Sequence, residues 1–468
     1  MYKIRIFDRN KITVLTAEKG ARLSDVLSNG GFFVDMPCGG NGKCEKCTLT
    51  VNGKKERACR HIINTDITVI LPEQNTSVSD SGCIHASKKP ENMCLALDIG
   101  TTTLALALVS PESGEAVRTL VCANSQRTAG ADIMARIEYC RKSGVEKLQA
   151  AVINDINRLT GLLNLKVPMP LYVAGNTTML HIFFGIDCSS LGTAPYTPVF
   201  LEPKTVSGES LGLKGVSRVL SLPCISAFAG ADITAGLSYA ALPENKKFNL
   251  LVDLGTNAEI ALFNNSYALC TSAAAGPCFE GASICCGMSA VEGAVYSYRD
   301  GRARVIGGGT AKGICATGLI DIAAFLLEKG IVDESGYMQC EKYEIDRDVY
   351  ITQGDIRQYQ LAKSAVFSAI CVLVDRSVAR FDDIETVYVS GGFSEGFNAE
   401  SAVKTGLFPN EFTNKTLPAG NSSLNGVIKY IREDGKLPEF IEKTKYADLS
   451  ADPLFSTAFI KNMSFRQK

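Results

Sequence analysis

The sequence has no tryptophan, only three histidines and no apolar run long enough to span a bilayer. Its formal net charge is −1, so the charge balance suggests no nucleic acid or other polyanion as a partner. Residues Tyr2–Phe7 alternate as a β-strand does and do not resemble a signal peptide. His61, His85 and His181 are isolated, which argues against metal ligation by histidine. We therefore expect a cytoplasmic protein with no membrane segment and no nucleic-acid partner.

Cysteine, by contrast, is abundant, with 17 residues in a chain of 468. In a cytoplasmic protein this number favours reduced thiols and cofactor chemistry over disulfides, and it fits an anaerobic host. The adjacent pair Cys285–Cys286 would be strained as a disulfide and lacks the spacing of a cluster site. We interpret these two residues as buried thiols.

Four cysteines in the first sixty residues have the spacing C-x5-C-x2-C-x11-C, namely Cys38, Cys44, Cys47 and Cys59. This spacing is similar to that of ferredoxins, which hold a 2Fe-2S cluster with four thiolates. The intervening loop is rich in glycine, which lets the backbone wrap a cluster closely. Zinc is the alternative, but zinc sites usually combine two C-x2-C pairs with a longer gap, and only one such pair is present. The pattern favours a 2Fe-2S cluster.

The strand and turn pattern divides the chain into several parts. In residues 1–72, we expect short strands and one short helix, as in a β-grasp ferredoxin-like domain, with strands at 2–7, 12–16, 48–51 and 67–71 and the helix at 22–28. Residues 73–92 are polar and without periodicity, which indicates a linker. From Cys94 onward, apolar strands alternate with amphipathic helices, for example at 131–163 and 361–381, and this alternation is typical of α/β layers.

Two strand–turn–strand units in the α/β part look alike. In the first, an apolar strand ends at Asp98 and is followed by Gly100, Thr101, Thr102 and Thr103; in the second, a strand ends at Asp253 and is followed by Gly255, Thr256, Asn257 and Glu259. Glycine permits a tight turn that brings backbone amides to phosphate oxygens, and the Thr and Asn side chains can donate to the same oxygens. The aspartates can hold Mg²⁺ through water. Because the units lie about 155 residues apart, they predict two similar lobes, 93–245 and 246–432, followed by a peripheral tail, 433–468.

Further segments complete this pattern. A third apolar strand ends in Ser390-Gly391-Gly392. The glycine turn there either binds the adenosine of a nucleotide against its backbone or is an ordinary strand-to-helix turn. Asn176 and Thr177 open a predicted helix and either line the phosphate site or only cap the helix. The segment 272–281 is rich in glycine and is expected near the nucleotide.

The phosphate loops and the adenosine loop resemble, in the same order, the ATPase fold shared by actin, sugar and acetate kinases and heat-shock chaperones. The segment Ala231–Tyr239 is similar to the chaperone segment E-P-T-A-A-A-x-A-Y. In that family the carboxylate there orients the attacking water, so the resemblance implies a catalytic role for Asp232, with a helix N-cap as the alternative. The resemblance also implies that ATP and Mg²⁺ bind in a cleft between the two lobes.

A ferredoxin domain joined to this ATPase fold resembles the reductive activators of corrinoid enzymes. That resemblance implies ATP-dependent one-electron reduction of a corrinoid protein from Co(II) to Co(I), with the electron taken from an upstream low-potential donor, and it is compatible with a homodimer. The chain departs from larger members of the family, which carry a further domain where only the segment 73–92 stands. The alternatives are a small-molecule kinase with a redox-sensing ferredoxin domain and a chaperone-like ATPase for a corrinoid protein.

Overall fold

The computed structural model describes residues 1–8, 11–30, 32, 34, 36, 42, 47–71, 77–80, 93–130, 132–241, 247–391 and 394–465. The chain divides into two compact units, Met1–Gly230 and Ala231–Lys468. In the described part of the chain, no helix has both the length and the apolar character needed to cross a membrane.

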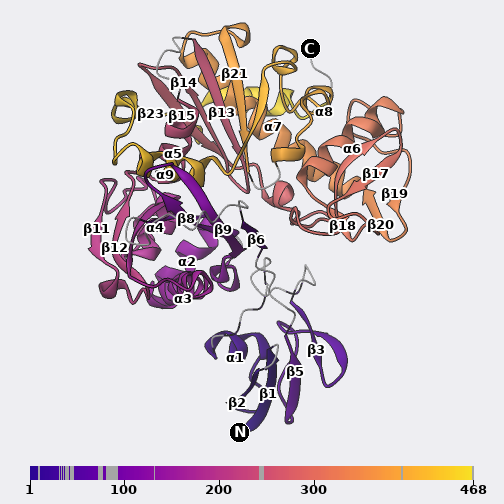
Figure 1. The fold of residues 1–468 in the computed structure, drawn as a ribbon. Helices are drawn as coiled ribbons and strands as arrows, with labels where there is room; N and C mark the ends of the chain where they lie inside the picture. The colour runs from indigo at the N-terminus through magenta and orange to yellow at the C-terminus, as the bar shows by residue number, and fades with distance from the viewer. Residues whose placement is uncertain are drawn as a thin grey trace. The chain divides into compact units, whose positions relative to one another are not determined.

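The first unit begins with a five-stranded mixed sheet in the order β2-β1-β5-β3-β4 and one helix (Figure 1). Its elements are β1 (Tyr2–Asp8), β2 (Lys11–Ala17), α1 (Leu23–Asn29), β3 (Thr48–Val51), β4 (Lys54–Arg57) and β5 (Ile67–Ile70). Inward-facing Ile4 and Ile6 of β1 pack with Leu23 and Leu27 of α1, and all four are fully buried. The strands and helix predicted here are confirmed, and β4 is an addition to them.

A seven-stranded sheet in the order β11-β12-β10-β7-β8-β9-β6 follows in the same unit. Its strands are β6 (Ser77–Asp80), β7 (Cys94–Ile99), β8 (Thr103–Ser110), β9 (Glu115–Ala123), β10 (Met169–Gly175), β11 (Thr205–Ser207) and β12 (Val216–Ser221). Strand β6 pairs antiparallel with β9 at the edge of the sheet. The predicted structureless linker over 73–92 is therefore wrong for residues 77–80, while 73–76 and 81–92 lie outside the described residues.

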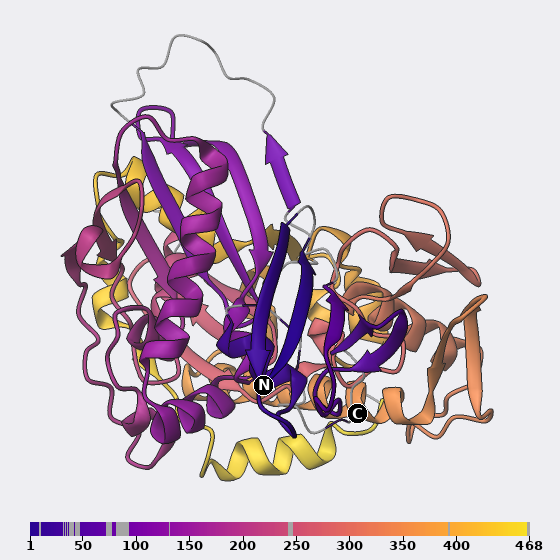
Figure 2. The same cartoon turned by 90° about the horizontal axis from the view of Figure 1, so that it is seen from below.

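Several helices accompany this sheet, and α3 packs on it near β8; Figure 2 shows a long helix of this unit lying along the sheet. The helices are η2 (Ser125–Thr128), α2 (Ile133–Ser143), α3 (Glu146–Leu163), α4 (Thr177–Phe183), η3 (Ser189–Gly192) and η4 (Glu209–Leu211). The single helix predicted over 131–163 is wrong, because Gly144 adopts φ 79° and separates α2 from α3. Only glycine takes such a conformation without strain, and it stops the helical hydrogen-bond ladder.

The second unit is built on a six-stranded sheet in the order β22-β21-β13-β14-β15-β23. Its strands are β13 (Phe248–Leu254), β14 (Ala258–Phe263), β15 (Ala268–Ala273), β21 (Ile384–Ser390), β22 (Thr416–Gly420) and β23 (Lys445–Tyr446). Five of them repeat the order and directions of β12-β10-β7-β8-β9, with three parallel strands followed by an antiparallel meander. The duplication predicted from the two strand–turn–strand units is confirmed at the level of topology.

The remaining strands of the second unit form two small sheets, made of β16 (Ala294–Arg299), β17 (Arg302–Val305) and β18 (Gly313–Ile314), and of β19 (Lys342–Asp346) and β20 (Val349–Thr352). Its helices are α5 (Ala231–Ala240), η5 (Pro277–Glu280), α6 (Ala316–Glu328), α7 (Gln353–Arg376), η6 (Phe381–Asp383), η7 (Ser394–Gly396), α8 (Ala399–Lys404), η8 (Asn410–Phe412), α9 (Ser422–Arg432), η9 (Glu439–Lys443) and α10 (Pro453–Lys461).

The long helix α7 begins eight residues before the predicted start at Leu361. A capping box fixes its true start: the Thr352 hydroxyl accepts a hydrogen bond from the Asp355 amide, and the Asp355 carboxylate accepts one from the Thr352 amide at 2.8 Å. These two bonds satisfy amides that the first helical turn leaves without intrahelical partners. The predicted end at Phe381 is also wrong, since α7 ends at Arg376.

Residues 433–465 pack against the main elements of the second unit, so the predicted peripheral tail over 433–468 is wrong for these residues. Strand β23 pairs with β15, and α10 packs along α7. Beyond α10, Phe465 is 5% exposed and its ring stacks on that of Tyr359 with the centroids 6.2 Å apart. Burial of the Phe465 ring against α7 anchors this segment on the second unit.

Helix α5 follows β12 as α9 follows β22, and the two helices pack on each other at glycine contacts. A Cβ added at Gly426 of α9 would lie 1.9 Å from the Ala235 carbonyl oxygen of α5, and one added at Gly236 would lie 3.1 Å from Ser422 Oγ. By this packing α5 belongs with the second unit, whereas the prediction placed residues up to 245 in the first lobe.

We predict that Gly426→Ala destabilises the second unit by about 1–3 kcal/mol or more, because the new methyl group would overlap backbone atoms of α5. The matched control is Gly161→Ala on α3, where a Cβ meets nothing within 4 Å. This change should stabilise the protein by roughly 0.5–1 kcal/mol. Urea unfolding of both variants checks the pair, and equal midpoints would contradict the close helix crossing.

Candidate nucleotide and cluster sites

The first predicted phosphate loop joins the antiparallel strands β7 and β8. Strand β7 also pairs in parallel with β10, with Asp98 opposite Ala174 and Ile99 opposite Gly175. The carboxyl ends of both strands therefore meet at one edge, where α/β sheets place ligands. A Cβ added at Gly100 would lie 2.8 Å from the Thr103 carbonyl oxygen, so the tight turn requires glycine. Asp98, the loop and the start of α4 thus lie close together.

Asn176 and Thr177 open α4 at this edge, and the helix-cap alternative describes their observed bonds. Asn176 is the N-cap and its side-chain oxygen accepts from the Thr178 amide at 3.0 Å. The Thr177 hydroxyl donates to the Ser226 carbonyl oxygen at 2.6 Å. Both residues are almost fully buried. Their contact with a nucleotide remains a prediction.

The second predicted phosphate loop joins β13 and β14 and contacts the glycine-rich segment 272–281. The Thr256 amide donates to Glu280 Oε1 at 3.0 Å, and the Gly276 amide donates to the Thr256 carbonyl oxygen at 2.9 Å. Glu280 is absent from the predicted site residues. A phosphate oxygen can use the Thr256 amide only after this carboxylate releases it, because one N–H cannot serve two anions well.

Asp253 lies at the carboxyl end of β13, beside the predicted adenosine loop. Its carboxylate Oδ2 is 3.0 Å from the Ser390 hydroxyl, which is 2.8 Å from the Ser422 hydroxyl at the start of α9. Gly391 adopts φ 123°, which favours glycine, and its amide donates to the Gly420 carbonyl oxygen. Asp253 and Gly391 therefore lie close together, while Gly392 lies outside the described residues.

Three carboxylates share one face of the second unit's main sheet. Asp253 pairs in register with Glu259, so both side chains point to the same face. Asp232 lies in the first turn of α5, which covers that face, and its Oδ1 accepts from the amide of the next residue, Ile233, at 2.8 Å. Because Asp232 lies inside the helix, it is not the predicted N-cap. The charges of Asp232 and Glu259 add to burial in raising the pKa of the Cys270 thiol to about 12.

The β3–β4 hairpin brings together the two predicted cluster ligands that the structure describes. Cys47 precedes β3 and Cys59 follows β4, and the Ala58 amide donates to the Cys47 carbonyl oxygen. Both thiols are buried and their sulfur atoms are 3.3 Å apart. A guanidinium nitrogen of Arg57 donates to the Gly42 carbonyl oxygen at 2.9 Å and so ties the cluster loop to the hairpin.

This donor set fits a metal cluster, since two buried soft ligands converge beside a glycine-containing loop. Cys38 and Cys44, the other two predicted ligands, lie outside the described residues. Among the residues that are described, no group of three or more His, Cys, Asp or Glu side chains has the arrangement of a metal site. The interpretation of Cys285–Cys286 as buried thiols is wrong, because Cys285 is exposed and Cys286 is partly exposed.

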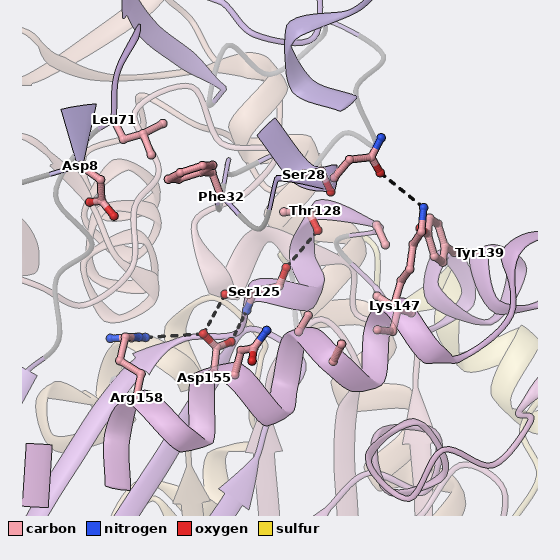
Figure 3. A pocket seen from close by; sticks show the side chains of 16 residues that line it. Asp8, Ser28, Phe32, Leu71, Ser125, Thr128, Tyr139, Lys147, Asp155 and Arg158 are labelled. Carbon is pink, nitrogen blue, oxygen red and sulfur yellow. Dashed lines mark hydrogen bonds and ion pairs between the residues drawn. The ribbon is translucent and has the colours of Figure 1, made fainter. Parts of the chain in front are cut away.

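A cavity of about 530 Å³ in the first unit is lined by α3, η2 and part of the N-terminal segment (Figure 3). None of the predicted loop residues lines it. Its buried carboxylate, Asp155 of α3, accepts hydrogen bonds from the amide and the hydroxyl of Ser125, both at 2.8 Å, and lies 3.6 Å from Arg158. Burial raises the pKa of Asp155. These contacts fix η2 on α3.

The fold and these loops define the class of protein, an α/β protein with an ATPase-type domain. A model of the C-terminal domain of RACo, described as the ASKHA domain, matches residues 247–468, and a model of the RACo middle region matches residues 93–245. The chain therefore belongs to the RACo family, the reductive activators of corrinoid proteins.

The chain is also similar to two relatives and to one solved structure. The chain is 28% identical over 418 residues to the corrinoid activation enzyme RamQ of Eubacterium limosum, covering 79% of this chain and 70% of RamQ. It is 26% identical over 399 residues to the [Co(II) methylated amine-specific corrinoid protein] reductase of Methanosarcina barkeri, covering 77% and 73% of the two chains. The solved reductive activator for a corrinoid, iron-sulfur protein has the same fold, with a TM-score of 0.73, 24% identity and coverage of 99% and 98%.

Proposed function

We propose that this protein uses ATP to reduce the cobalt of a corrinoid protein from inactive Co(II) to Co(I). The observation that carries the proposal is the combination of both RACo domains with a ferredoxin-like cysteine pattern in one chain. The names of the two relatives, a corrinoid activation enzyme and a Co(II) corrinoid protein reductase, support the same reaction. The corrinoid protein is the partner, and its cobalt is the substrate.

We assign the electron-carrying part to residues 1–72. Cys38, Cys44, Cys47 and Cys59 would hold a 2Fe-2S cluster, which supplies a one-electron carrier when bound. The convergence of Cys47 and Cys59 in the buried hairpin supports this assignment. An upstream low-potential donor supplies the electron.

The energetics explain why an ATPase domain accompanies the electron carrier. Plant-type 2Fe-2S centres have potentials of about −400 mV, and Co(I) is a still stronger reductant. The transfer is therefore uphill, and each additional step of about 59 mV lowers its equilibrium constant tenfold. ATP can favour the transfer only by binding different conformations of the complex with different affinity.

We assign ATP and Mg²⁺ to the residues at the carboxyl ends of the duplicated strands. The loops Gly100–Thr103 and Gly255–Asn257 would hold the phosphates, Gly391 and Gly392 the adenosine, and Asp98 and Asp253 the hydrated metal. Asn176, Thr177 and Glu259 lie beside these loops, and Asp232 would orient the attacking water. The observed parallel pairing of β7 with β10 and of β13 with β21 supports these groupings.

An activity assay tests the proposal. Protein prepared without oxygen is mixed with a chemical reductant, MgATP and each candidate Co(II) corrinoid protein, and Co(I) is followed by its visible absorbance. We expect Co(I) to form with at least one candidate and only when both ATP and the protein are present. Formation at the same rate without ATP, or ATP-dependent phosphorylation of a small molecule in its place, would contradict the proposal.

A further inference from the structure

Three consecutive carbonyl groups of the first phosphate loop, those of residues 100–102, accept hydrogen bonds from residues outside the loop. The side-chain amide of Asn124 donates to the Gly100 carbonyl oxygen at 2.8 Å, and the backbone amide of Asn124 donates to that of Thr102 at 2.9 Å. The guanidinium group of Arg136 donates through Nη2 to the carbonyl oxygen between them, that of Thr101. Consecutive carbonyl groups of this turn are thus fixed by two residues outside it.

This anchoring also sets the direction of the loop's amides. In a trans peptide unit, the C=O of one residue and the N–H of the next point in opposite directions. Because the carbonyl groups of residues 100–102 point toward Asn124 and Arg136, the amides of residues 101–103 point away from those anchors. A turn with its amides fixed in advance binds an anion without the cost of ordering them.

Arg136 lies on α2 and is fully buried. Its other donor groups contact residues 126 and 130 and helix α4, all near the first phosphate loop. Its Nε donates to the Gly130 carbonyl oxygen at 3.1 Å and its Nη1 to Gln126 Oε1 at 3.2 Å. Nη1 is also 3.0 Å from the sulfur of Met179 in α4, the helix that Asn176 caps. A buried guanidinium therefore connects the phosphate loop to the start of α4 and adds positive charge behind the loop.

The anchors are themselves held by α3. The Gln126 side-chain amide donates to the Leu148 carbonyl oxygen at 3.0 Å, and the neighbouring Ser125 donates to Asp155. The side-chain oxygen of Asn124 accepts from the Gln126 amide at 3.0 Å. The hydrogen bonds of this network are buried or partly buried, which strengthens them and favours a single geometry of the loop.

We propose that Arg136 and Asn124 are positioning residues that fix the amides of the loop Gly100–Thr103 for the phosphates of a nucleoside triphosphate. This inference rests on the proposed binding of ATP at this loop, and it names the residues that hold the loop in the conformation that binds phosphate. Neither residue needs to touch the nucleotide, since each acts through a loop carbonyl group. Loss of either anchor should affect triphosphate binding more than adenosine binding, because the adenosine loop lies on other strands.

Two variants of the full-length chain test the proposal. Asn124→Asp keeps the oxygen that caps η2 but loses the donor to Gly100, and Arg136→Lys keeps the charge but loses the forked donors. We expect the dissociation constant for MgATP to rise about 10- to 100-fold in each variant. This is the usual effect of losing a hydrogen bond that involves a charged group, as in Arg136→Lys, or that leaves a buried acceptor without its donor, as in Asn124→Asp. Affinity for adenosine should change less than threefold. Hydrogen exchange should quicken in the peptide containing residues 100–103 and stay unchanged in that containing residues 255–257.

The matched control is Arg141→Met on the same helix, because that side chain is 59% exposed and pairs with Glu138 at the surface. Its MgATP affinity should equal that of the parent chain. If Arg136→Lys does not fold, Asn124→Asp decides the question alone. Parent-like MgATP affinity and exchange in a folded Asn124→Asp variant would overturn the positioning role while leaving the proposed function intact. Failure of the parent chain to bind MgATP would overturn the proposed function itself.

Discussion

Cys59→Ser should abolish reduction of the corrinoid partner while leaving ATP hydrolysis intact. Cys59 is 2% exposed and its sulfur lies 3.3 Å from that of Cys47, so a hydroxyl there removes a soft ligand from a preformed pair. We expect the purified variant to lose the red-brown colour and the S = 1/2 resonance of the reduced protein. The nucleotide loops lie on other sheets, so nucleotide binding should be unchanged.

Cys340→Ser is the matched control, because Cys340 is a partly exposed thiol of the second unit, far in sequence from the cysteine pattern. It should keep the colour, the resonance and full reduction. A colourless Cys59→Ser protein that still reduces cobalt at the parent rate would show that the electron takes another route. If the parent protein instead contained stoichiometric zinc and had no visible absorbance, the cysteines would form a zinc site and the cluster assignment would be wrong.

Asp232→Asn should slow ATP hydrolysis by roughly 10²- to 10⁴-fold, the usual contribution of a general base. The asparagine oxygen can still accept from the Ile233 amide, so the start of α5 should be preserved. The affinity for MgATP should therefore stay within a few-fold of the parent value. Single-turnover hydrolysis and equilibrium nucleotide binding, measured on the same preparation, separate the two effects.

The control for this substitution is Asp375→Asn, an exposed carboxylate near the end of α7. It should hydrolyse ATP at the parent rate. Full turnover by Asp232→Asn would show that this carboxylate only stabilises the first turn of α5 through the helix dipole. In that case Asp98 or Asp253 becomes the candidate for positioning the water.

The sequence predicted correctly those parts of the fold that depend on residues close together in the chain. The two apolar strands that end in glycine–threonine turns predicted the hairpins β7–β8 and β13–β14, because few other structures satisfy that pattern. The α7 start was missed although Thr352 and Asp355 have capping-box spacing, since Gly354 interrupts the apolar pattern there. The break at Gly144 was missed because the amphipathic pattern continues on both sides of it.

Distant contacts explain the remaining differences. Nothing near Phe465 in the sequence indicates that it stacks on Tyr359, more than 100 residues earlier, so the end of the chain looked peripheral. The same is true of the site residues that the sequence did not reveal. Glu280 meets Thr256 across 24 positions, and Arg136 meets Thr101 across 35. The local sequence signal for Arg136 was its place on a predicted helix between the apolar residues Ile133 and Ile137. Both of these residues are buried in the structure.

A single-turnover experiment tests the central claim most directly. The protein is reduced by one electron, freed of other reductant and mixed with a Co(II) corrinoid protein in a stopped-flow spectrometer, with and without MgATP. We predict that the absorbance of the oxidised cluster returns and that of Co(I) appears with one shared rate constant, in equal amounts, and only with MgATP. Co(I) formation without any change in cluster absorbance, or transfer of equal extent without ATP, would contradict ATP-driven electron transfer through this chain.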